Sequence, residues 1–388
     1  NVRRLETIRH YKQVKTSLSV SKGLIYGALS LKSTAFLLPT LLNTLMDSLN
    51  QRFLRDGGHL SRSPSWHLEE LRTLMEVRNA LASRSLSIQE PLDNAITRYL
   101  NALATLVHSD QRLALFNDTI EQDVRDVWRL WQSWRKTPPQ PYFYLEAMRF
   151  VRLQQTSSVA IMDVGPPKLR LSRSFYGALS FEFSAAEERI IVNCGGYRGN
   201  NAAWRKVCKT TSAHSALTID DENSWQPPTR ANHTLVQQPD VKCDFVESQD
   251  RLGVEASYNG YVPFAGLIHS RRLVLSDEGN MLEGQDALTP HPSVSQHETR
   301  RVRLRFHLHP SVIISRISRG VVDVKTPMGQ HWRFETLQEY AAGVEESVYL
   351  GDAGIPQKSL QITIESLIAK DKDLRIPWKL YRPAGGAA

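Results

Sequence analysis

The fold is decided by one stretch of sequence, which reads GALSFEF (177–183), RIIVNCGGYRGNNAAWRK (189–206) and TTSAHSALTIDDENS (210–224). Leu179, Phe181 and Phe183 alternate with other residues, and this period of two is typical of a strand with one buried face. The second piece indicates a strand that ends at a Gly-Gly turn, followed by a short helix or loop with a tryptophan. A third strand is predicted to open at His214. The stretch therefore predicts consecutive strands joined by short connections.

The first 135 or so residues have a different period, because their apolar residues recur at helical spacing. A helix is predicted from Leu38 to Phe53, and the Asp-Gly-Gly turn at 56–58 ends it. Ser63-Pro64 is typical of the start of the next helix. Further helices are predicted over about 16–31 and 87–107 and around three tryptophans, Trp128, Trp131 and Trp134. Short loops between them predict antiparallel helical hairpins.

The segment TPPQP (137–141) is the clearest linker, because a proline-rich segment can neither continue a helix nor pair in a central strand. We predict a helical part over 1–136, a linker over 137–145, a β-sandwich over 146–382 and a disordered tail over 383–388. Strands are predicted over 146–154, 158–164, 178–183, 189–193, 214–219, 252–257, 271–276, 301–309, 311–317, 321–326, 331–335, 346–350 and 358–364. So many strands without intervening helices indicate an antiparallel sandwich.

The composition favours a folded protein with an anionic partner. Of 388 residues 41% are hydrophobic, the formal net charge is +8, and no run of apolar residues is long enough to span a membrane. Nucleic acid is not favoured as the partner, because no zinc-finger, RNP, KH or helix-turn-helix signature accompanies the charge. The chain begins at Asn1 within a basic helical pattern, which we interpret as an N-terminally incomplete chain.

The order of helical hairpins, linker and strands resembles the heparinase II/III-like polysaccharide lyases. The resemblance is carried by DGGHLSRSPSWHLEEL (56–71), VAIMDVGPP (159–167), GALSFEF, AHSALTIDD (213–221) and VRLRFHLHP (302–310). It implies an α + β multidomain protein, with an incomplete (α/α) toroid followed by a large antiparallel β-sandwich. It also implies an acidic, uronate-containing polysaccharide bound in a cleft between the two, and a bacterial envelope or periplasmic location.

Such lyases cleave by β-elimination, which needs a group that neutralises the uronate carboxylate, a base and an acid. In this family a tyrosine and histidines serve in these roles, and two histidines with an aspartate hold a structural zinc. Here the tyrosine position falls on Trp66, and the His-x-His motif falls on Arg173 and Phe175. The aspartate falls on Asn193, so only His214 survives. The resemblance therefore predicts that the zinc site is lost and that no cofactor is present.

The remaining candidates for catalysis are His59, His67, Tyr176 and His214. Tyr176 would act as the acid if Arg173 lowers the pKa of its phenol. The candidates for substrate binding are Arg62, which would pair with a carboxylate, and Asn117, Arg173, Trp204 and Arg205. The alternative is structural: the residues near the Gly57-Gly58 turn would form a capped loop, and His214 would be a hydrogen-bonded core residue.

The run RVRLRFHLH (301–309) alternates without a break, so a strand would carry three Arg and two His on one face. This face is either a cationic track for a polyanion or an ordinary surface paired with acids. The tryptophan stripe is interpreted as core packing rather than as a sugar-binding platform. Two functions are therefore carried forward: a lyase acting on an acidic glycan by elimination, or a non-catalytic glycan-binding or envelope polysaccharide assembly protein on a degenerate lyase scaffold.

Overall fold

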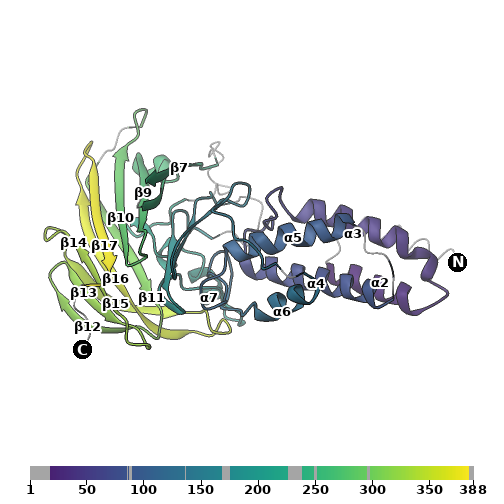
Figure 1. Cartoon of the computed structure of the whole chain (residues 1–388). Coiled ribbons are helices and arrows are strands. Elements are labelled where there is room, and N and C mark those ends of the chain that lie inside the picture. The colour runs from purple at the N-terminus through teal and green to yellow at the C-terminus, as the bar shows by residue number, and fades with distance from the viewer. Residues whose placement is uncertain are drawn as a thin grey trace. The chain divides into compact units, whose positions relative to one another are not determined.

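The computed structural model describes residues 18–84, 86, 90–135, 137–167, 175–225, 238–248, 251–294 and 298–383. The chain divides into two compact units. The first runs to Thr105 and resumes over Val124–Met148, and the second comprises Leu106–Asp123 and the chain from Arg149 onward. Helices dominate the first unit and strands the second (Figure 1).

The first unit is built from helical hairpins, as the apolar spacing predicts. Its elements are α2 (Leu18–Ser30), a 3-10 turn (Ala35–Leu37), α3 (Leu38–Arg52), α4 (Pro64–Ser83), α5 (Glu90–Thr105), α6 (Arg125–Trp134) and β1 (Tyr144–Leu145). In α4 the first residue is Pro64, whose missing N–H costs nothing at a helix start. No helix in the described parts of the chain is long and apolar enough to cross a membrane. The toroid that the family resemblance implies stays a prediction.

The second unit contains two large antiparallel sheets, which confirms the predicted α + β class with extensive antiparallel pairing. One sheet has the order β2-β3-β4-β5-β11-β16-β15, with β6 paired to β11. Its strands are β2 (Phe150–Gln155), β3 (Ser158–Asp163), β4 (Phe181–Ala185), β5 (Glu188–Val192), β6 (Leu217–Ile219), β11 (Arg300–Leu308), β15 (Ala342–Tyr349) and β16 (Gln357–Ile368). The helix α7 (Ala202–Val207) follows β5, where the sequence predicts a short helix or loop.

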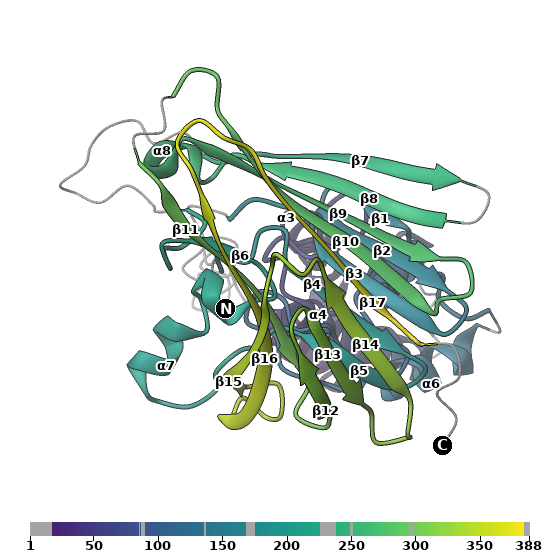
Figure 2. The ribbon, with the colours of Figure 1, turned by 90° about the vertical axis from the view of Figure 1, so that its left-hand side faces the viewer.

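The other sheet has the order β12-β13-β14-β17-β10-β9-β8-β7 (Figure 2). Its strands are β7 (Val241–Ser248), β8 (Arg251–Tyr258), β9 (Leu267–Ser276), β10 (Met281–Pro290), β12 (Ile313–Ser318), β13 (Val321–Lys325), β14 (His331–Thr336) and β17 (Leu374–Tyr381). A short helix, α8 (Val262–Ala265), precedes β9.

Aromatic side chains join the two sheets into one core. The ring of Phe181 on β4 stacks on Trp378 of β17, with centroids 5.4 Å apart, and Phe306 of β11 meets the same indole at 4.8 Å. Phe334 of β14 adds a further stacked contact to Trp378. Each fully buried side chain of this size stabilises the fold by about 1.5–3 kcal/mol. The alternating apolar residues of β4 and β11 therefore hold the sheets face to face.

A buried charged pair also lies between the sheets. The Arg271 guanidinium donates to Asp286 Oδ1 from Nε at 2.8 Å, and its Nη1 donates to the carbonyl oxygens of Leu179 and Ser215, both at 2.7 Å. Asp286 accepts further bonds from His269 and from the Trp378 indole. Leu179 and Ser215 lie just before β4 and β6 of the other sheet. The hydrogen bonds of Arg271 therefore connect the two sheets.

The unit boundary differs from the boundary predicted at the proline-rich segment. Residues 106–123, predicted to belong to the helical part, lie in the strand-rich unit. His108 is bonded to Glu182 and Ser184, and Asp110 forms an ion pair with Arg189. These polar partners on β4 and β5 explain why the segment belongs with the sheets. Of the predicted tail, residues 384–388 lie outside the described part of the chain.

Candidate functional site

In the helical unit, the turn after Asp56 is held by hydrogen bonds to the end of that unit. Asp56 Oδ2 accepts from the backbone N–H groups of Ala147 and Met148, at 2.7 and 2.8 Å. Gly58 lies so close to Met148 that a Cβ atom on it would come within 2.5 Å of the methionine side chain. Arg62 is buried, and its Nε donates to the Met148 carbonyl oxygen at 2.9 Å. Arg62 thus contacts a backbone carbonyl here, where a carboxylate partner is predicted.

The two histidines near this turn are buried and hydrogen-bonded. His59 has one ring nitrogen 3.0 Å from Glu70 and the other 2.7 Å from Ser61. His67 is fully enclosed, its Nε2 donates to the Tyr99 carbonyl oxygen at 2.8 Å, and burial lowers its pKa to about 3. A catalytic base must reach the proton it removes. These contacts therefore favour the structural alternative for both side chains.

In the strand-rich unit, Phe175 occupies the position that the resemblance assigns to a zinc-ligating histidine. Its ring is buried in an apolar cluster with Cys208 and Leu350. It also meets the ring of His214 edge to face, with centroids 6.0 Å apart and an interplanar angle of 83°. An aromatic ring in this place offers no lone pair to a cation and fills the space beside the surviving histidine.

Asn193 and His214 are committed to other partners. The Asn193 side-chain oxygen accepts from the Ser215 N–H at 2.9 Å, and its backbone N–H donates to Glu182. His214 Nδ1 donates to the Thr210 carbonyl oxygen at 2.8 Å, and burial lowers the pKa of the ring to about 4. Zinc needs deprotonated N, S or O donors in a tetrahedral set. The residues here do not fit that metal, and among the described residues no group of three His, Cys, Asp or Glu is arranged to hold one.

Tyr176 follows Phe175 and is half-buried. Its backbone carbonyl accepts from Thr211 and Ser224, and its ring lies near Trp225, with centroids 6.5 Å apart. Burial raises the pKa of its phenol, and the effect of Arg173 on that pKa stays a prediction. Arg173, the arginine assigned to that effect, lies outside the described residues.

Two of the predicted binding residues, Trp204 and Arg205, lie on α7, and a third, Asn117, lies in the segment 106–123. Trp204 is half-buried and lines a hollow of about 610 Å³ beside β11, β15 and β16, which we call the Trp204 hollow. Arg205 is exposed, but its guanidinium turns back to the Gly199 carbonyl oxygen and does not line the hollow. Asn117 is half-buried in a left-handed backbone conformation with φ 47°. Of these three residues, Trp204 is the one that lines the hollow described here.

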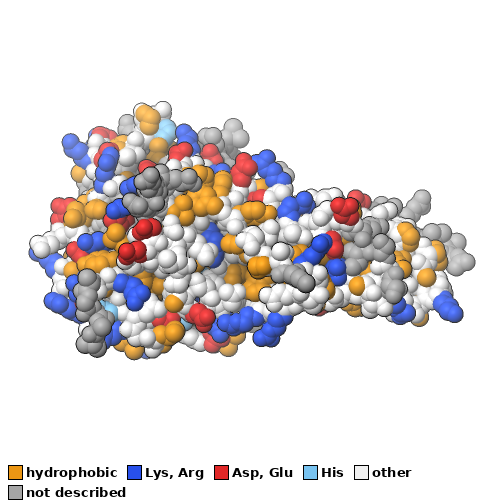
Figure 3. Space-filling model, viewed as in Figure 1, with side chains coloured by type: hydrophobic (Ala, Val, Ile, Leu, Met, Phe, Trp, Pro, Cys, Tyr) orange, Lys and Arg blue, Asp and Glu red, His pale blue; other side chains and the backbone are white. Residues whose placement is uncertain are grey.

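The basic face of β11 is paired with acids, which corrects the hypothesis of an open cationic track. Arg301 and Arg305 form ion pairs with Asp221, and Arg303 forms one with Glu365. Basic and acidic side chains are interspersed on the face of the molecule shown in Figure 3, without a continuous basic stripe.

The two histidines of this run also have separate partners. His307 is bonded to Ser347 and to the Ser212 carbonyl oxygen, whereas His309 is bonded to Ser311. Each of the two histidines is therefore held by its own hydrogen bonds.

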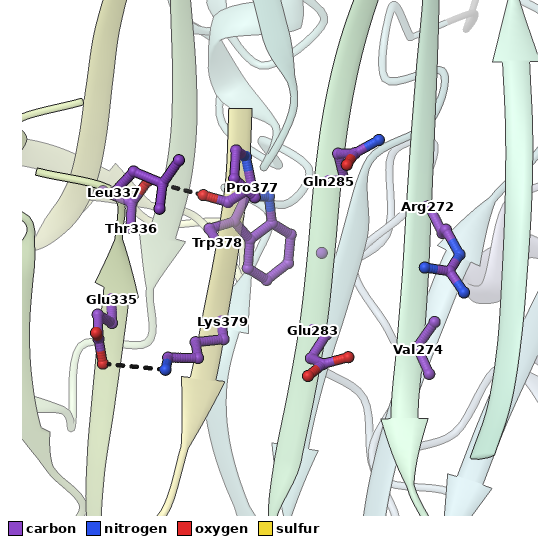
Figure 4. A pocket seen from close by; sticks show the side chains of 11 residues that line it. Arg272, Val274, Glu283, Gln285, Glu335, Thr336, Leu337, Pro377, Trp378 and Lys379 are labelled. Atoms are coloured by element: carbon purple, nitrogen blue, oxygen red, sulfur yellow. Dashed lines mark hydrogen bonds and ion pairs between the residues drawn. The ribbon is translucent and has the colours of Figure 1, made fainter. Parts of the chain in front are cut away.

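A second hollow, of about 330 Å³, lies on the outer face of the sheet that contains β9, β10, β14 and β17 (Figure 4). We call it the Arg272 groove. Arg272 of β9 is exposed and lies opposite Gln285 of β10 in the strand register. Across the groove, Lys379 forms an ion pair with Glu335 at 3.4 Å. Glu283 is paired with Arg251 outside the groove. Among the described residues, Arg272 forms no ion pair or hydrogen bond, and Glu255 of β8 lies opposite it in the strand register.

Sequence reasoning does not identify the residues that line these hollows from β10, β15, β16 and β17. Gln361, Ser347 and Gln285 belong to no motif, and their neighbours in space are distant in sequence. The only available signal is the regular alternation of strands, which assigns side chains to a face but not to a hollow. The cleft that the resemblance implies stays a prediction.

Comparison with known proteins identifies a family and several similar proteins. The family described as "Heparinase II/III-like, C-terminal" matches residues 137–379. The chain is 27% identical to FtsZ-localized protein C of Caulobacter vibrioides, over 95% of this chain and 65% of that protein. The chain thus spans about two thirds of the length of this curated relative.

The fold is similar to part of the fold of two solved lyases. The heparan sulfate lyase HepC from Pedobacter heparinus matches with a TM-score of 0.73 and 14% identity, over 96% of this chain and 60% of that one. A crystal structure of heparinase III matches with a TM-score of 0.74 and 13% identity, over 94% and 60%. At these identities the likeness shows the architecture alone.

Proposed function

This chain belongs to the heparinase II/III-like family, and from that premise we propose that it binds an acidic polysaccharide without cleaving it. Membership of the family supports an acidic polysaccharide as the ligand. The packing of the candidate catalytic residues supports the absence of cleavage. The observation that carries it is the aromatic contact of Phe175 with His214, in the place where the resemblance implies a metal ligand.

The candidate proton-transfer groups support this choice. An acid in β-elimination must carry a proton at neutral pH, yet burial lowers the pKa of His67 to about 3 and that of His214 to about 4. Each ring also donates its one proton to a backbone carbonyl. The position of the family tyrosine is Trp66, whose indole cannot act as an acid in this way.

The Arg272 groove is the place where we propose that the polysaccharide binds. A guanidinium pairs with a carboxylate through two parallel hydrogen bonds, and a uronate presents such a carboxylate on each sugar. Arg272 is exposed and unpaired among the described residues, while Gln285 beside it supplies an amide for a sugar hydroxyl. Pro377 adds apolar surface for a ring. The net charge of +8 favours the approach of a polyanion.

We further propose that the protein acts at the site of cell division. The support is the name of the relative, FtsZ-localized protein C, which matches along nearly the whole of this chain. A fluorescent fusion of the full-length protein should form a band at the division site in its bacterial host. A signal spread evenly through the cell would contradict this part of the proposal.

The experiment for the main proposal combines an activity assay with a binding assay on the full-length protein. Incubation with heparan sulfate should give no ultraviolet absorbance from an unsaturated uronate, with heparinase III as the positive control. Binding measured by calorimetry should weaken by about 10- to 100-fold in Arg272→Ala, because a hydrogen-bonded charge is lost.

The matched control is Arg316→Ala, which removes an exposed arginine of the same sheet outside the groove. It should change the affinity less than threefold or so, because distant exposed charges are screened by salt. Formation of an unsaturated product would establish the lyase alternative instead. An equal loss of affinity in both variants would show that the binding follows net charge and not this groove.

A further inference from the structure

The Trp204 hollow contains an unpaired buried acceptor. Gln361 on β16 is 8% exposed and lines the hollow. Its Nε2 lies 3.3 Å from Glu345, and because a carboxylate only accepts hydrogen bonds, the NH2 group must face that side. Among the described residues, Oε1 has no hydrogen-bond partner. A buried acceptor without a partner costs about 1–3 kcal/mol, so this oxygen favours a ligand that donates.

The same hollow has a second hydrogen-bond acceptor, Ser347 Oγ, whose hydroxyl hydrogen is directed by His307. Its Nε2 lies 3.0 Å from the Ser212 carbonyl oxygen and must therefore carry the ring proton. Burial lowers the pKa of the ring to about 3, so Nδ1 is an acceptor at neutral pH. Ser347 lies 2.7 Å from Nδ1 and uses its hydroxyl hydrogen there. Ser347 Oγ also contacts the Cys194 thiol, and of its two lone pairs one is left as an acceptor on the lining of the hollow.

The charges around the hollow do not favour an anion. Arg305 lines it, but its two terminal nitrogens donate to Thr218 and to the Asp221 carboxylate, at 2.7 and 2.9 Å. The thiol of Cys194 stays neutral, because burial raises its pKa to about 12. Glu346 is exposed at the lining and adds a negative charge. A carboxylate or sulfate would therefore meet acceptors and a like charge.

The opposite wall is aromatic. Trp204 packs against the cluster of Phe175, Cys208 and Leu350, and the ring of Tyr197 lies 6.4 Å from it at an angle of 32°. This packing fixes the indole at the edge of the hollow. A fixed aromatic wall opposite several hydrogen-bond acceptors is complementary to a ring with an apolar face and hydroxyl donors around its rim.

We propose that the Trp204 hollow binds one uncharged sugar residue, whose hydroxyl groups donate to Gln361 Oε1 and Ser347 Oγ and whose ring lies against Trp204. The volume of about 610 Å³ is within the range of pockets for small ligands. This site is distinct from the Arg272 groove in position, in lining residues and in the charge of its ligand.

The experiment is ligand-observed NMR on the full-length protein, with methyl glucoside, methyl N-acetylglucosaminide and glucuronate as separate probes. At least one neutral probe should bind, and Gln361→Leu should weaken it about tenfold, because one buried hydrogen bond to the ligand is lost. Val207→Trp provides a second variant on an exposed side chain of the lining, and it should abolish binding by filling the hollow. Arg316→Ala, on an exposed arginine that lines neither hollow, is the matched control and should leave the neutral probe unaffected.

Several outcomes would overturn this inference. One is that no neutral probe binds, and another is that glucuronate binds more tightly than both neutral probes in a manner sensitive to Val207→Trp. If a neutral probe binds equally well to the wild type and to Val207→Trp, its binding site lies outside the Trp204 hollow. The binding of the acidic polysaccharide is tested through Arg272. If the neutral probe fails to bind the Trp204 hollow, the proposed function is unaffected. If the polysaccharide fails to bind the Arg272 groove, the sugar site in the Trp204 hollow is unaffected.

Discussion

Replacement of Arg271 by methionine tests whether the buried charged pair holds the two sheets together. Arg271 is 0% exposed and donates to Asp286 and to the carbonyl oxygens of Leu179 and Ser215. Methionine has a similar length and is apolar, so the change removes the donors without leaving a large cavity. Asp286 is then left as a buried carboxylate without its cation.

The magnitude follows from the pKa of Asp286. Burial alone would raise this pKa, but Arg271 and the bond from His269 lower it from the usual 3.8 to about 2. This difference corresponds to about 2–3 kcal/mol of folding stability. Because the folded-state pKa is depressed, the contribution is present above about pH 4 and is lost as the pH falls towards 2. Since removal of one partner also leaves the other charge buried, we expect a total loss of about 3–5 kcal/mol.

The assay is urea unfolding at neutral pH, followed by tryptophan fluorescence. Arg271→Met should lower the free energy of unfolding by about 3–5 kcal/mol, whereas the double variant with Asp286→Asn should lose less, because no charge is then left unpaired. The control Arg272→Met changes the exposed neighbour on the same strand and should cost under about 0.5 kcal/mol. A loss below about 1 kcal/mol in Arg271→Met, or a double variant that loses the sum of both single changes, would refute the reasoning.

Three further predictions follow from the packing. The double variant Phe175→His with Asn193→Asp restores the family's zinc donors beside His214. It should retain about one zinc per chain after dialysis, as measured by elemental analysis. A zinc content equal to that of the wild type would contradict the assignment of these positions. Burial lowers the pKa of His67 from 6.5 to about 3, so the unfolded chain gains a proton that the folded chain excludes. The free energy of unfolding should therefore fall as the pH drops from about 6.5 towards 3, and His67→Gln should make this fall less steep in urea titrations at several pH values. Gly58→Ala should cost about 1–3 kcal/mol, because its Cβ would lie 2.5 Å from a methionine side chain, whereas Gly23→Ala, with nothing within 4 Å in a helix, should gain about 0.5–1 kcal/mol in thermal unfolding.

The helices could be predicted from the sequence because their signals are local. The helix predicted from Leu38 to Phe53 is observed as α3, Leu38–Arg52, and Pro64 starts α4 as predicted. Each of these elements has its apolar stripe and its terminal residues within about 20 positions of the chain, which is the range over which helical periodicity is read.

The strands β7, β10 and β17 were not among the predicted ones, because the reasons for them are distant in sequence. In β10, Gly284 and Asp286 disfavour a strand by propensity. The folded protein needs both: the indole of Trp378 occupies the space beside Gly284, and Asp286 is the buried partner of Arg271. Pro377 weakens the signal of β17 in the same way. Tertiary packing overrides local preference at these positions.

The candidate site was predictable only in part. The loss of the zinc donors can be read from the identities of Phe175 and Asn193 once the resemblance is recognised. The neutralisation of the basic strand cannot be read in this way, because Glu365, the partner of Arg303, lies 62 residues further along the chain. The burial of His59 and His67 depends in the same way on partners brought together by folding.

The apolar cluster around Phe175 has a consequence for the conditions under which the protein can work. In a relative that depends on an ion at this corner, chelation or scarcity of the ion would loosen the loop that carries the surviving histidine. Here that loop is anchored by carbon-to-carbon contacts and by the Thr210 carbonyl. We therefore expect a zinc chelator to leave the thermal unfolding of the protein unchanged.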